Sequence, residues 1–195
     1  ADITTINTSC SGINDGQAIA SVSSGGFPNY NYSWSASGQS NSPTASGLAP
    51  GSITVTVTDS RGCTATASDL ISAPPALTLN ITQVDDSCYL GGRGNATANV
   101  TGGNAPYTFY WSNISSAQTN LNMPAGNYSV TVTDNNGCTV TGTTTINQPS
   151  AISNTTTVQN ISCNGTNSGS VNLSTTGGTP TYSYTWSPSG SGSNP

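Results

Sequence analysis

The sequence predicts an all-β protein, built from small antiparallel β-sandwiches that follow one another in tandem. Two observations lead to this fold class. The chain repeats itself about every 75 residues, and within each copy apolar and polar residues alternate with a period of two, as they do in strands with one buried face. No segment of useful length shows the 3.6-residue period of a helix.

Cysteine, tryptophan and proline mark the repeat. Cys63 and Cys138 are 75 residues apart, and so are Pro74 and Pro149. This length is too great for a solenoid repeat and suits a small independent domain. Proline stiffens the short junctions "ISAPPALTL" and "INQPSAIS", so we expect an extended tandem. The predicted domains are 1–75, 76–150 and the first part of a third copy at 151–195, which lacks the counterpart of 44–75.

The clearest strands are "SITVTVTD" (52–59) and "YSVTVTD" (128–134), which alternate apolar residues with serine or threonine. Each runs into a tight turn, "DSRGC" or "DNNGC", in which Asp starts the turn and Gly supplies the positive φ. A last strand follows, "CTATASDLI" or "CTVTGTTTI". With the shorter strands before them, each copy has six or seven, which predicts a sandwich that is immunoglobulin-like in general shape.

Each copy also carries a Gly-Gly pair followed by three aromatic residues at every second position, as in "GGFPNYNYSW". Residues at this spacing share one face of a strand, so the rings form either a sugar-binding platform or a hydrophobic core. We predict a core centred on tryptophan, because the middle position accepts Phe and the opposite face is mostly polar. Tyr110 is an outward-facing exception. The predicted core aromatics are Tyr30, Tyr32, Trp34, Tyr107, Phe109, Trp111, Tyr182, Tyr184 and Trp186.

Charge is scarce. The chain has seven Asp, two Arg and no Lys, Glu or His, with a net charge of −5. Nucleic acid and anionic membrane surfaces call for a basic footprint, so neither is an expected partner. No apolar run approaches the ~20 residues of a membrane span. The usual nucleophile–base pairs are missing, and the adjacent Asp85 and Asp86 have no matching pair in the other copies. We therefore expect neither an enzyme nor a bound cofactor.

Asp59 and Asp134 recur at the start of the turn before the second cysteine of their copies. Calcium prefers oxygen ligands, so these two carboxylates are weak candidates for a Ca²⁺ site. The simpler interpretation is that each Asp closes its own turn by accepting backbone hydrogen bonds. We adopt this second interpretation and predict no metal site.

Five cysteines indicate disulfides, and hence an oxidising, extracellular setting. Because each domain should fold alone, we predict Cys10–Cys63 and Cys88–Cys138, with the partner of Cys163 beyond residue 195. An alternative scheme links neighbouring copies, as Cys63–Cys88 and Cys138–Cys163. Buried free thiols are a third interpretation. The spacing of the cysteines does not decide among the three.

The order of these features resembles the SprB-type repeat, which occurs in large secreted surface proteins of Bacteroidetes, including gliding-motility adhesins. The motif in the first copy runs Cys10, Gly25, Gly26, Tyr30, Tyr32, Trp34, Gly51, Asp59, Gly62 and Cys63. In the second copy it runs Cys88, Gly102, Gly103, Tyr107, Phe109, Trp111, Gly126, Asp134, Gly137 and Cys138. The segment "CYLGGRG" (88–94) departs from the usual short Cys-Asn-Gly turn.

The resemblance implies non-catalytic spacer repeats in the stalk of a secreted adhesin filament of gliding-motility type. It places them outside the cell, on a surface protein attached to the outer membrane. The alternative is a polysaccharide-binding β-sandwich module of such an adhesin. The expected partners are the neighbouring repeats and, for the alternative, surface polysaccharide or the substratum. Low charge and Val/Thr edge strands would also permit lateral self-association of chains.

Overall fold

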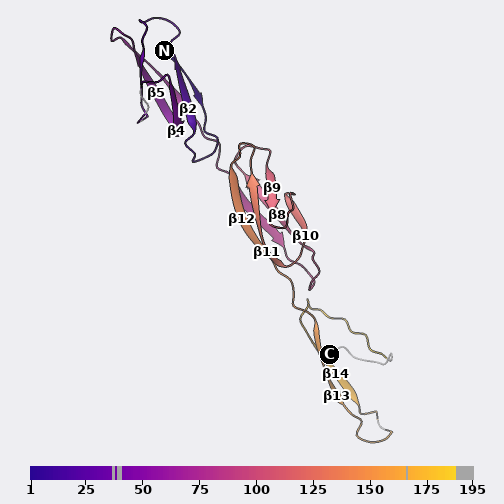
Figure 1. Cartoon of the computed structure of the whole chain (residues 1–195). Helices are drawn as coiled ribbons and strands as arrows, with labels where there is room; N and C mark the ends of the chain where they lie inside the picture. Colours follow the sequence, from indigo (N-terminus) through magenta and orange to yellow (C-terminus); the bar gives the residue numbers. More distant parts are fainter. Residues whose placement is uncertain (37, 39–40, 166, 188–195) are drawn as a thin grey trace. The chain divides into compact units, whose positions relative to one another are not determined.

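The computed structural model describes residues 1–36, 38, 41–165 and 167–187, and every regular element among them is a β-strand (Figure 1). The predicted all-β class is thus confirmed. The strands of the first copy are β1 (Asp2–Ile6), β2 (Gly16–Ser21), β3 (Asn31–Trp34), β4 (Thr44–Leu48), β5 (Gly51–Thr58) and β6 (Thr64–Ile71).

These six strands form two antiparallel three-stranded sheets, with the orders β1-β2-β4 and β3-β5-β6. The alternation of β5 explains the arrangement, because Ile53, Val55 and Val57 point inward while the threonines between them are less buried. Side chains from both sheets join in a single hydrophobic cluster, which is the arrangement of a β-sandwich. Its buried members are Ala18, Ala20, Trp34, Ala45, Leu48, Ile53, Val55, Val57 and Ile71.

The second copy repeats this topology strand for strand. Its sheets have the orders β10-β8-β7 and β12-β11-β9, which correspond to those of the first copy. Its buried apolar side chains also lie at corresponding positions, with Trp111 in place of Trp34 and Ile146 in place of Ile71. The strands are β7 (Thr78–Val84), β8 (Gly94–Thr101), β9 (Thr108–Trp111), β10 (Thr119–Met123), β11 (Gly126–Thr133) and β12 (Thr139–Ile146).

The third copy contributes one antiparallel hairpin, β13 (Ser153–Gln159) with β14 (Ser170–Thr176). Its three aromatic residues follow this hairpin and are half-buried. The rings of Tyr182 and Tyr184 meet edge to face, with 6.4 Å between centroids. Residues 188–195 of this copy lie outside the described part of the chain.

Strands β4 and β10 are among those that the sequence did not predict. Both are interrupted by a residue with positive φ at the same position, Gly47 (φ 69°) and Asn122 (φ 55°). The pairing of each with its neighbour shifts register once, as it does at a β-bulge. Such a kink breaks the regular alternation that identifies a strand in a sequence, and glycine and asparagine tolerate it best.

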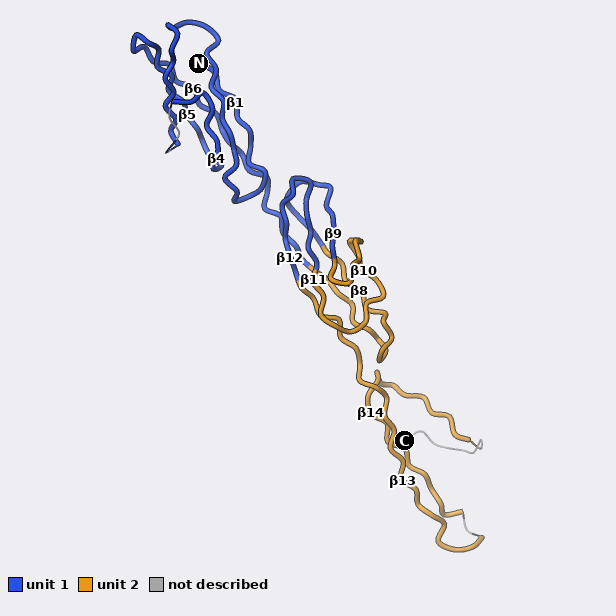
Figure 2. The backbone as a smooth tube through the Cα atoms, viewed as in Figure 1, with its two compact units in different colours: residues 1–80, 99–110, 130–142 blue, residues 81–98, 111–129, 143–195 orange. Residues whose placement is uncertain are grey.

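The chain forms two compact units (Figure 2). The first comprises 1–80, 99–110 and 130–142, and the second comprises 81–98, 111–129 and 143–195. These units do not follow the repeat, since both contain part of the second copy. The domain limits inferred at residues 75 and 150 therefore stay a prediction.

Candidate functional site

The tryptophans lie in the core in both complete copies. Trp34 is 6% exposed and Trp111 is 0% exposed. The indole Nε1–H of Trp34 donates to the carbonyl oxygen of Ser42, and that of Trp111 donates to Ala117, both at 2.9 Å. A buried ring with a satisfied N–H has no face left for a sugar. Tyr110 is 64% exposed, in agreement with its predicted outward direction.

The first aromatic residue of each copy has a role that its position alone did not predict. The hydroxyl of Tyr30 donates to the carbonyl oxygen of Gly25 (3.1 Å), and that of Tyr107 donates to Gly102 (2.6 Å). Tyr182 makes the same bond to Gly177. This bond ties the aromatic strand to the Gly-Gly turn. The signal was present in the sequence, because this position is Tyr in all three copies whereas the middle one accepts Phe.

A buried aspartate joins the same turn to the hairpin that carries the second cysteine. Asp134 Oδ1 accepts the backbone N–H of Asn136 and of Cys138, both at 2.9 Å, and Oδ2 accepts that of Asn104 at 2.9 Å. In the first copy the N–H donors to Asp59 are Arg61 (2.9 Å), Cys63 (2.8 Å) and Phe27 (3.1 Å). Both carboxylates thus bridge two loops with both of their oxygens.

These bonds also determine how the two carboxyls ionise. The N–H of Cys63, followed by those of Phe27 and Arg61, keeps the pKa of Asp59 below its usual value against the opposing effect of burial. For Asp134, burial is the largest single influence and raises the pKa, but the N–H donors led by Asn104 together outweigh it and lower the pKa. Each Asp is therefore held as an anion by backbone dipoles.

Replacing Asp134 by asparagine should lower the Tm by several degrees. An amide keeps one acceptor oxygen and turns its NH₂ group toward backbone N–H groups, so at least one buried donor loses its partner. The measurement is thermal unfolding followed by circular dichroism, with Asp2→Asn on exposed strand β1 as the matched control. Equal Tm values for the two variants would contradict a bridging role for Asp134.

Between about pH 2 and pH 7, the stability of the protein should fall only at the acid end of the range. Six aspartates have a folded-state pKa below the usual value, so their stabilising contribution is complete above the unfolded pKa of about 3.9 and is lost as the pH falls through the folded values. No Glu or His is present to titrate between pH 5 and 7. We expect a constant Tm from pH 7 to 5 and a steep fall below about pH 4; a Tm that holds down to pH 2 would refute this. The six residues are Asp15, Asp59, Asp69, Asp85, Asp86 and Asp134.

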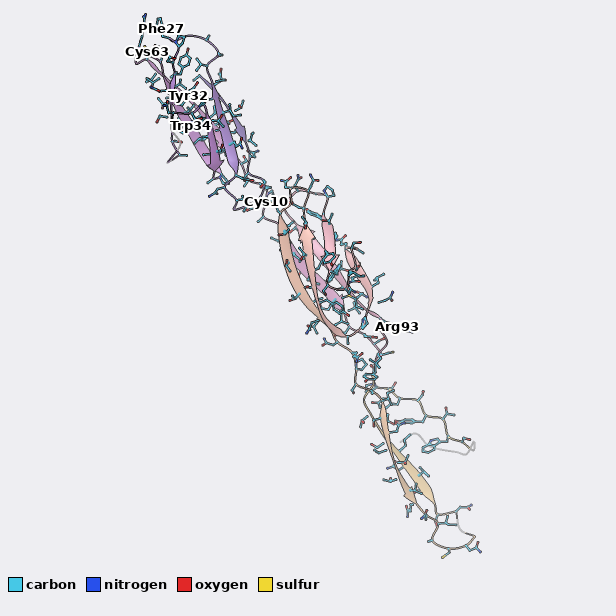
Figure 3. All side chains as sticks on the ribbon, in the orientation of Figure 1. Cys10, Phe27, Tyr32, Trp34, Cys63 and Arg93 are labelled. Atoms are coloured by element: carbon cyan, nitrogen blue, oxygen red, sulfur yellow. A yellow bond between two sulfur atoms is a disulfide. The ribbon has the colours of Figure 1, made fainter. Side chains whose placement is uncertain are left out.

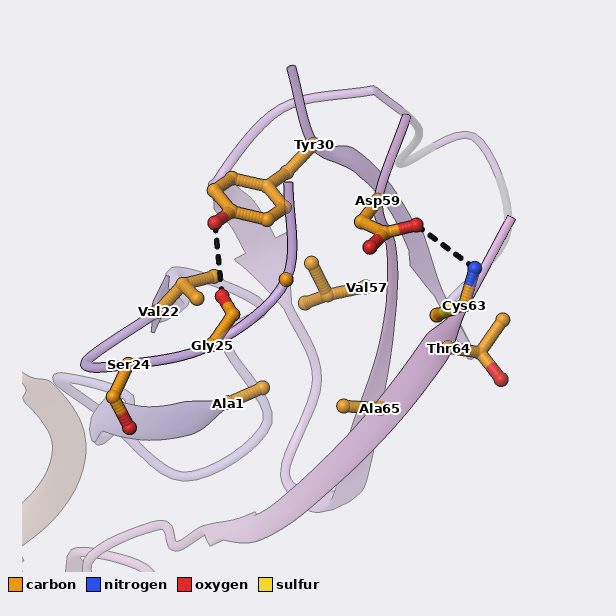
Figure 4. Close-up of a pocket in the computed structure, with 11 residues that line it drawn as sticks. Ala1, Val22, Ser24, Gly25, Tyr30, Val57, Asp59, Cys63, Thr64 and Ala65 are labelled. Carbon is orange, nitrogen blue, oxygen red and sulfur yellow. Dashed lines mark hydrogen bonds between the residues drawn. The ribbon is translucent and has the colours of Figure 1, made fainter. Parts of the chain in front are cut away.

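A cavity of about 190 Å³ opens beside the Gly-Gly turn of the first copy (Figure 4). Val22 and Val57, the ring of Tyr30 and the thiol of Cys63 contribute to its walls. The carboxylate of Asp59 accepts hydrogen bonds from backbone N–H groups, so few polar groups remain to orient a ligand.

Within the described residues, no group of three or more His, Cys, Asp or Glu side chains is placed to hold a metal ion.

The adjacent pair Asp85 and Asp86 also braces loops. Asp85 Oδ1 accepts the backbone N–H of Asn147 at 2.9 Å. Asp86 accepts N–H bonds from Cys88 (3.1 Å) and Arg93 (3.2 Å). Asn7 accepts the hydrogen bond from the backbone N–H of Ser72 that corresponds to the bond between Asp85 and Asn147, so the bracing does not require a carboxylate.

A search of the described residues found no helix with the length and apolar character of a membrane span.

The disulfide in the structure differs from the predicted pairing. Cys10 of the first copy is bonded to Cys138 of the second, with 5.8 Å between their Cα atoms. The predicted bonds Cys10–Cys63 and Cys88–Cys138 are therefore wrong, and so are the alternative bonds Cys63–Cys88 and Cys138–Cys163. Cys63 and Cys88 are exposed thiols outside this bond, so the interpretation of buried thiols also does not hold.

The physical reason is the length of a strand. Cys63 immediately precedes β6, whereas Cys10 lies near the far end of β6, where the N–H of Thr8 bonds to the carbonyl of Ser72. Eight residues of strand span about 26 Å, and a disulfide requires Cα atoms within roughly 7 Å. Figure 3 shows Cys63 and Phe27 at one end of the first pair of sheets and Cys10 at the other.

Hydrogen bonds surround this disulfide. The side-chain amide of Asn136 donates to the carbonyl oxygen of Ser9 at 2.9 Å. The backbone N–H of Gly103 donates to the carbonyl of Pro75, in the linker, at 2.8 Å. A β-carbon at Gly102 would overlap the carbonyl of Ala76, so the first glycine of the pair is needed for this close approach. We call this set of contacts the junction.

The comparisons with solved structures return immunoglobulin-type proteins. One is described as "Structural basis for Dscam isoform specificity", at 14% identity and a TM-score of 0.32, over 76% of this chain and 42% of that chain. Another is "Structure of amphioxus IgVJ-C2 molecule", at 14% identity and a TM-score of 0.32, over 75% of this chain and 96% of that chain. The chain thus spans less than half of the Dscam structure. These values are too low to carry an argument about function.

The sequence comparisons are more specific. No protein with a curated description matches the chain. The SprB repeat family, in contrast, matches three times, at residues 3–39, 80–116 and 155–191, which together cover more than half of the sequence. The three matches begin at the first strand of each copy and extend past its tryptophan. The chain therefore belongs to the SprB repeat family.

Proposed function

We propose that these copies are spacer repeats of a large secreted cell-surface adhesin, in which they form a non-catalytic part of the stalk. The family is that of surface adhesin-type proteins. The gliding-motility setting, the outer-membrane attachment and the absence of catalysis are part of this proposal.

The observation that carries the proposal is the junction between the first two copies. A spacer must pass tension from one repeat to the next without relying on a flexible linker. Here a covalent bond, Cys10–Cys138, spans the junction beside the main chain. The other conspicuous groups are engaged in holding the fold, since the tryptophans are buried and Asp59 and Asp134 bridge loops.

Polysaccharide binding is the second candidate, and one observation favours it. Tyr110 is 64% exposed and Tyr89 is 50% exposed, so the second copy presents two aromatic rings to solvent. Aromatic faces are a common means of contacting sugars. Neither position is aromatic in the first copy, where Ser33 and Ser11 stand in the corresponding strand and loop. A module designed to bind would be expected to keep them.

The test is binding of the oxidised chain to a panel of bacterial and plant polysaccharides, measured by biolayer interferometry. The spacer function predicts no saturable retention on any of them. Saturable binding that is lost in Tyr110→Ala or Tyr89→Ala, but kept in Asp2→Asn, would replace the spacer function with the second candidate. The Tyr110→Ala variant must keep the Tm of the parent chain for this reading to stand.

A further inference from the structure

The disulfide has a direction along the repeat. It joins the first cysteine of one copy, Cys10, to the second cysteine of the following copy, Cys138. Within the first copy the two cysteines lie at opposite ends of β6, so the bond within a copy is out of reach. The same cysteine pairing can recur between later copies only if the contacts at their junctions are the same as those at the first junction.

The junction between the second and third copies repeats the contacts of the first. The N–H of Gly178 donates to the linker carbonyl of Ser150 at 2.8 Å, as Gly103 does to Pro75. A β-carbon at Gly177 would overlap the carbonyl of Ala151, as one at Gly102 would overlap that of Ala76. The two junctions differ in sequence, but the Gly-Gly pair makes the same two contacts with the linker in both.

The carbonyl next to the first cysteine is also contacted again. The carbonyl oxygen of Ser9, the residue before Cys10, accepts a hydrogen bond from the side-chain amide of Asn136 in the second copy. The carbonyl oxygen of Ser87, the residue before Cys88, accepts one from the hydroxyl of Thr179 in the third copy at 3.3 Å. The loop itself has the same turn, since the carbonyl of Cys10 accepts the N–H of Ile13 (3.3 Å) and that of Cys88 accepts the N–H of Gly91 (3.2 Å). Cys88 is exposed and outside any disulfide.

We propose that the disulfides of this repeat are staggered: the first cysteine of every copy bonds to the second cysteine of the next copy. The rule assigns to Cys88 the cysteine that matches Cys138 in a completed third copy. It assigns to Cys63 the first cysteine of a copy on its N-terminal side. A run of n copies would then be joined by n − 1 covalent bonds, one at each junction.

The chemistry is a two-electron oxidation. The two thiols lose two protons and two electrons, and a sulfur–sulfur bond forms. The acceptor is a small disulfide such as oxidised glutathione, whose own sulfur–sulfur bond breaks to give two thiols after exchange through a mixed disulfide. The inference concerns how copies are joined and does not rest on the spacer function, since a sugar-binding array could be stapled in the same way.

The test extends the chain to complete its third copy. Residues 1–186 are followed by a second 112–150 segment that carries Thr139→Ser, an exposed position, as a mass mark. The protein is folded in oxidised and reduced glutathione, alkylated, digested with pepsin at low pH to prevent exchange, and mapped by mass spectrometry. We expect Cys10 bonded to the original Cys138, Cys88 bonded to the marked cysteine, and Cys63 alkylated.

Two results would overturn the rule. One is a bond from Cys88 to the original Cys138, and the other is alkylated Cys88 in a chain that has formed Cys10–Cys138. If tryptophan fluorescence shows that the extended chain does not fold, the original chain with Cys10→Ser provides the test. There Cys88 and Cys138 should both be alkylated, and a Cys88–Cys138 bond would refute the stagger.

Discussion

Trp111→Ala should abolish cooperative unfolding of the second copy. The ring is 0% exposed, and its Nε1–H bond to Ala117 fixes the loop after β9. Truncation of a buried Trp costs about 3–5 kcal/mol through lost burial and the cavity left behind. A core in a domain of this size rarely supplies more than about 3–5 kcal/mol in total. The variant should therefore sit near or below the folding threshold.

The neighbouring residue provides the control for this experiment. Tyr110 lies on the same strand with its ring 64% exposed, so Tyr110→Ala should change the free energy of unfolding by no more than roughly 0.5 kcal/mol. Both variants are measured by chemical denaturation with near-UV circular dichroism. If Trp111→Ala and Tyr110→Ala proved equally stable, the tryptophan would not be the centre of the core.

Reduction of the Cys10–Cys138 bond should lengthen the fully stretched chain by about 450 Å. The bond bypasses a sequence separation of 128 residues, and an extended residue spans about 3.5 Å. In an oxidising buffer that length stays hidden when the chain is pulled from its two ends, because the disulfide carries the force. The measurement is single-molecule force spectroscopy with and without a thiol reductant.

Two cysteine variants make this result specific. Cys10→Ser should give the long contour without reductant, whereas Cys88→Ser should keep the short one. Bonds within each copy would produce a different pattern, since Cys88→Ser would then release the loop of the second copy. Equal contour lengths with and without reductant would show that the disulfide between copies is absent.

The core follows directly from periodicity. The alternation of "SITVTVTD" is enough to place Val55 and Val57 inside, and the spacing of the aromatic residues places Trp34 beside them. The turn position of Asp59 likewise indicates a residue that bonds backbone N–H groups. These are local patterns, and a strand pleat or a tight turn imposes them whatever lies around it.

The strands β4 and β10 show where a local pattern is insufficient. Positive φ at Gly47 and Asn122 interrupts the alternation in both, and only pairing with β2 or β8 identifies them as strands. The reach of Asp134 to Asn104 belongs to the same class, because 30 residues separate the two in sequence. Contacts of this kind require knowledge of which loops meet at one end of the sandwich.

The sequence by itself determined the repeat, the all-β class, the family and the inward-facing residues of the regularly alternating strands, because each is encoded in spacing along the chain. Tertiary structure alone decided the cysteine partners. The first cysteine of a copy follows its first strand and the second precedes its last, so a strand length separates them within the copy. Only the way successive copies meet brings Cys10 to Cys138, because a disulfide depends on distance in space and not on membership of the same repeat.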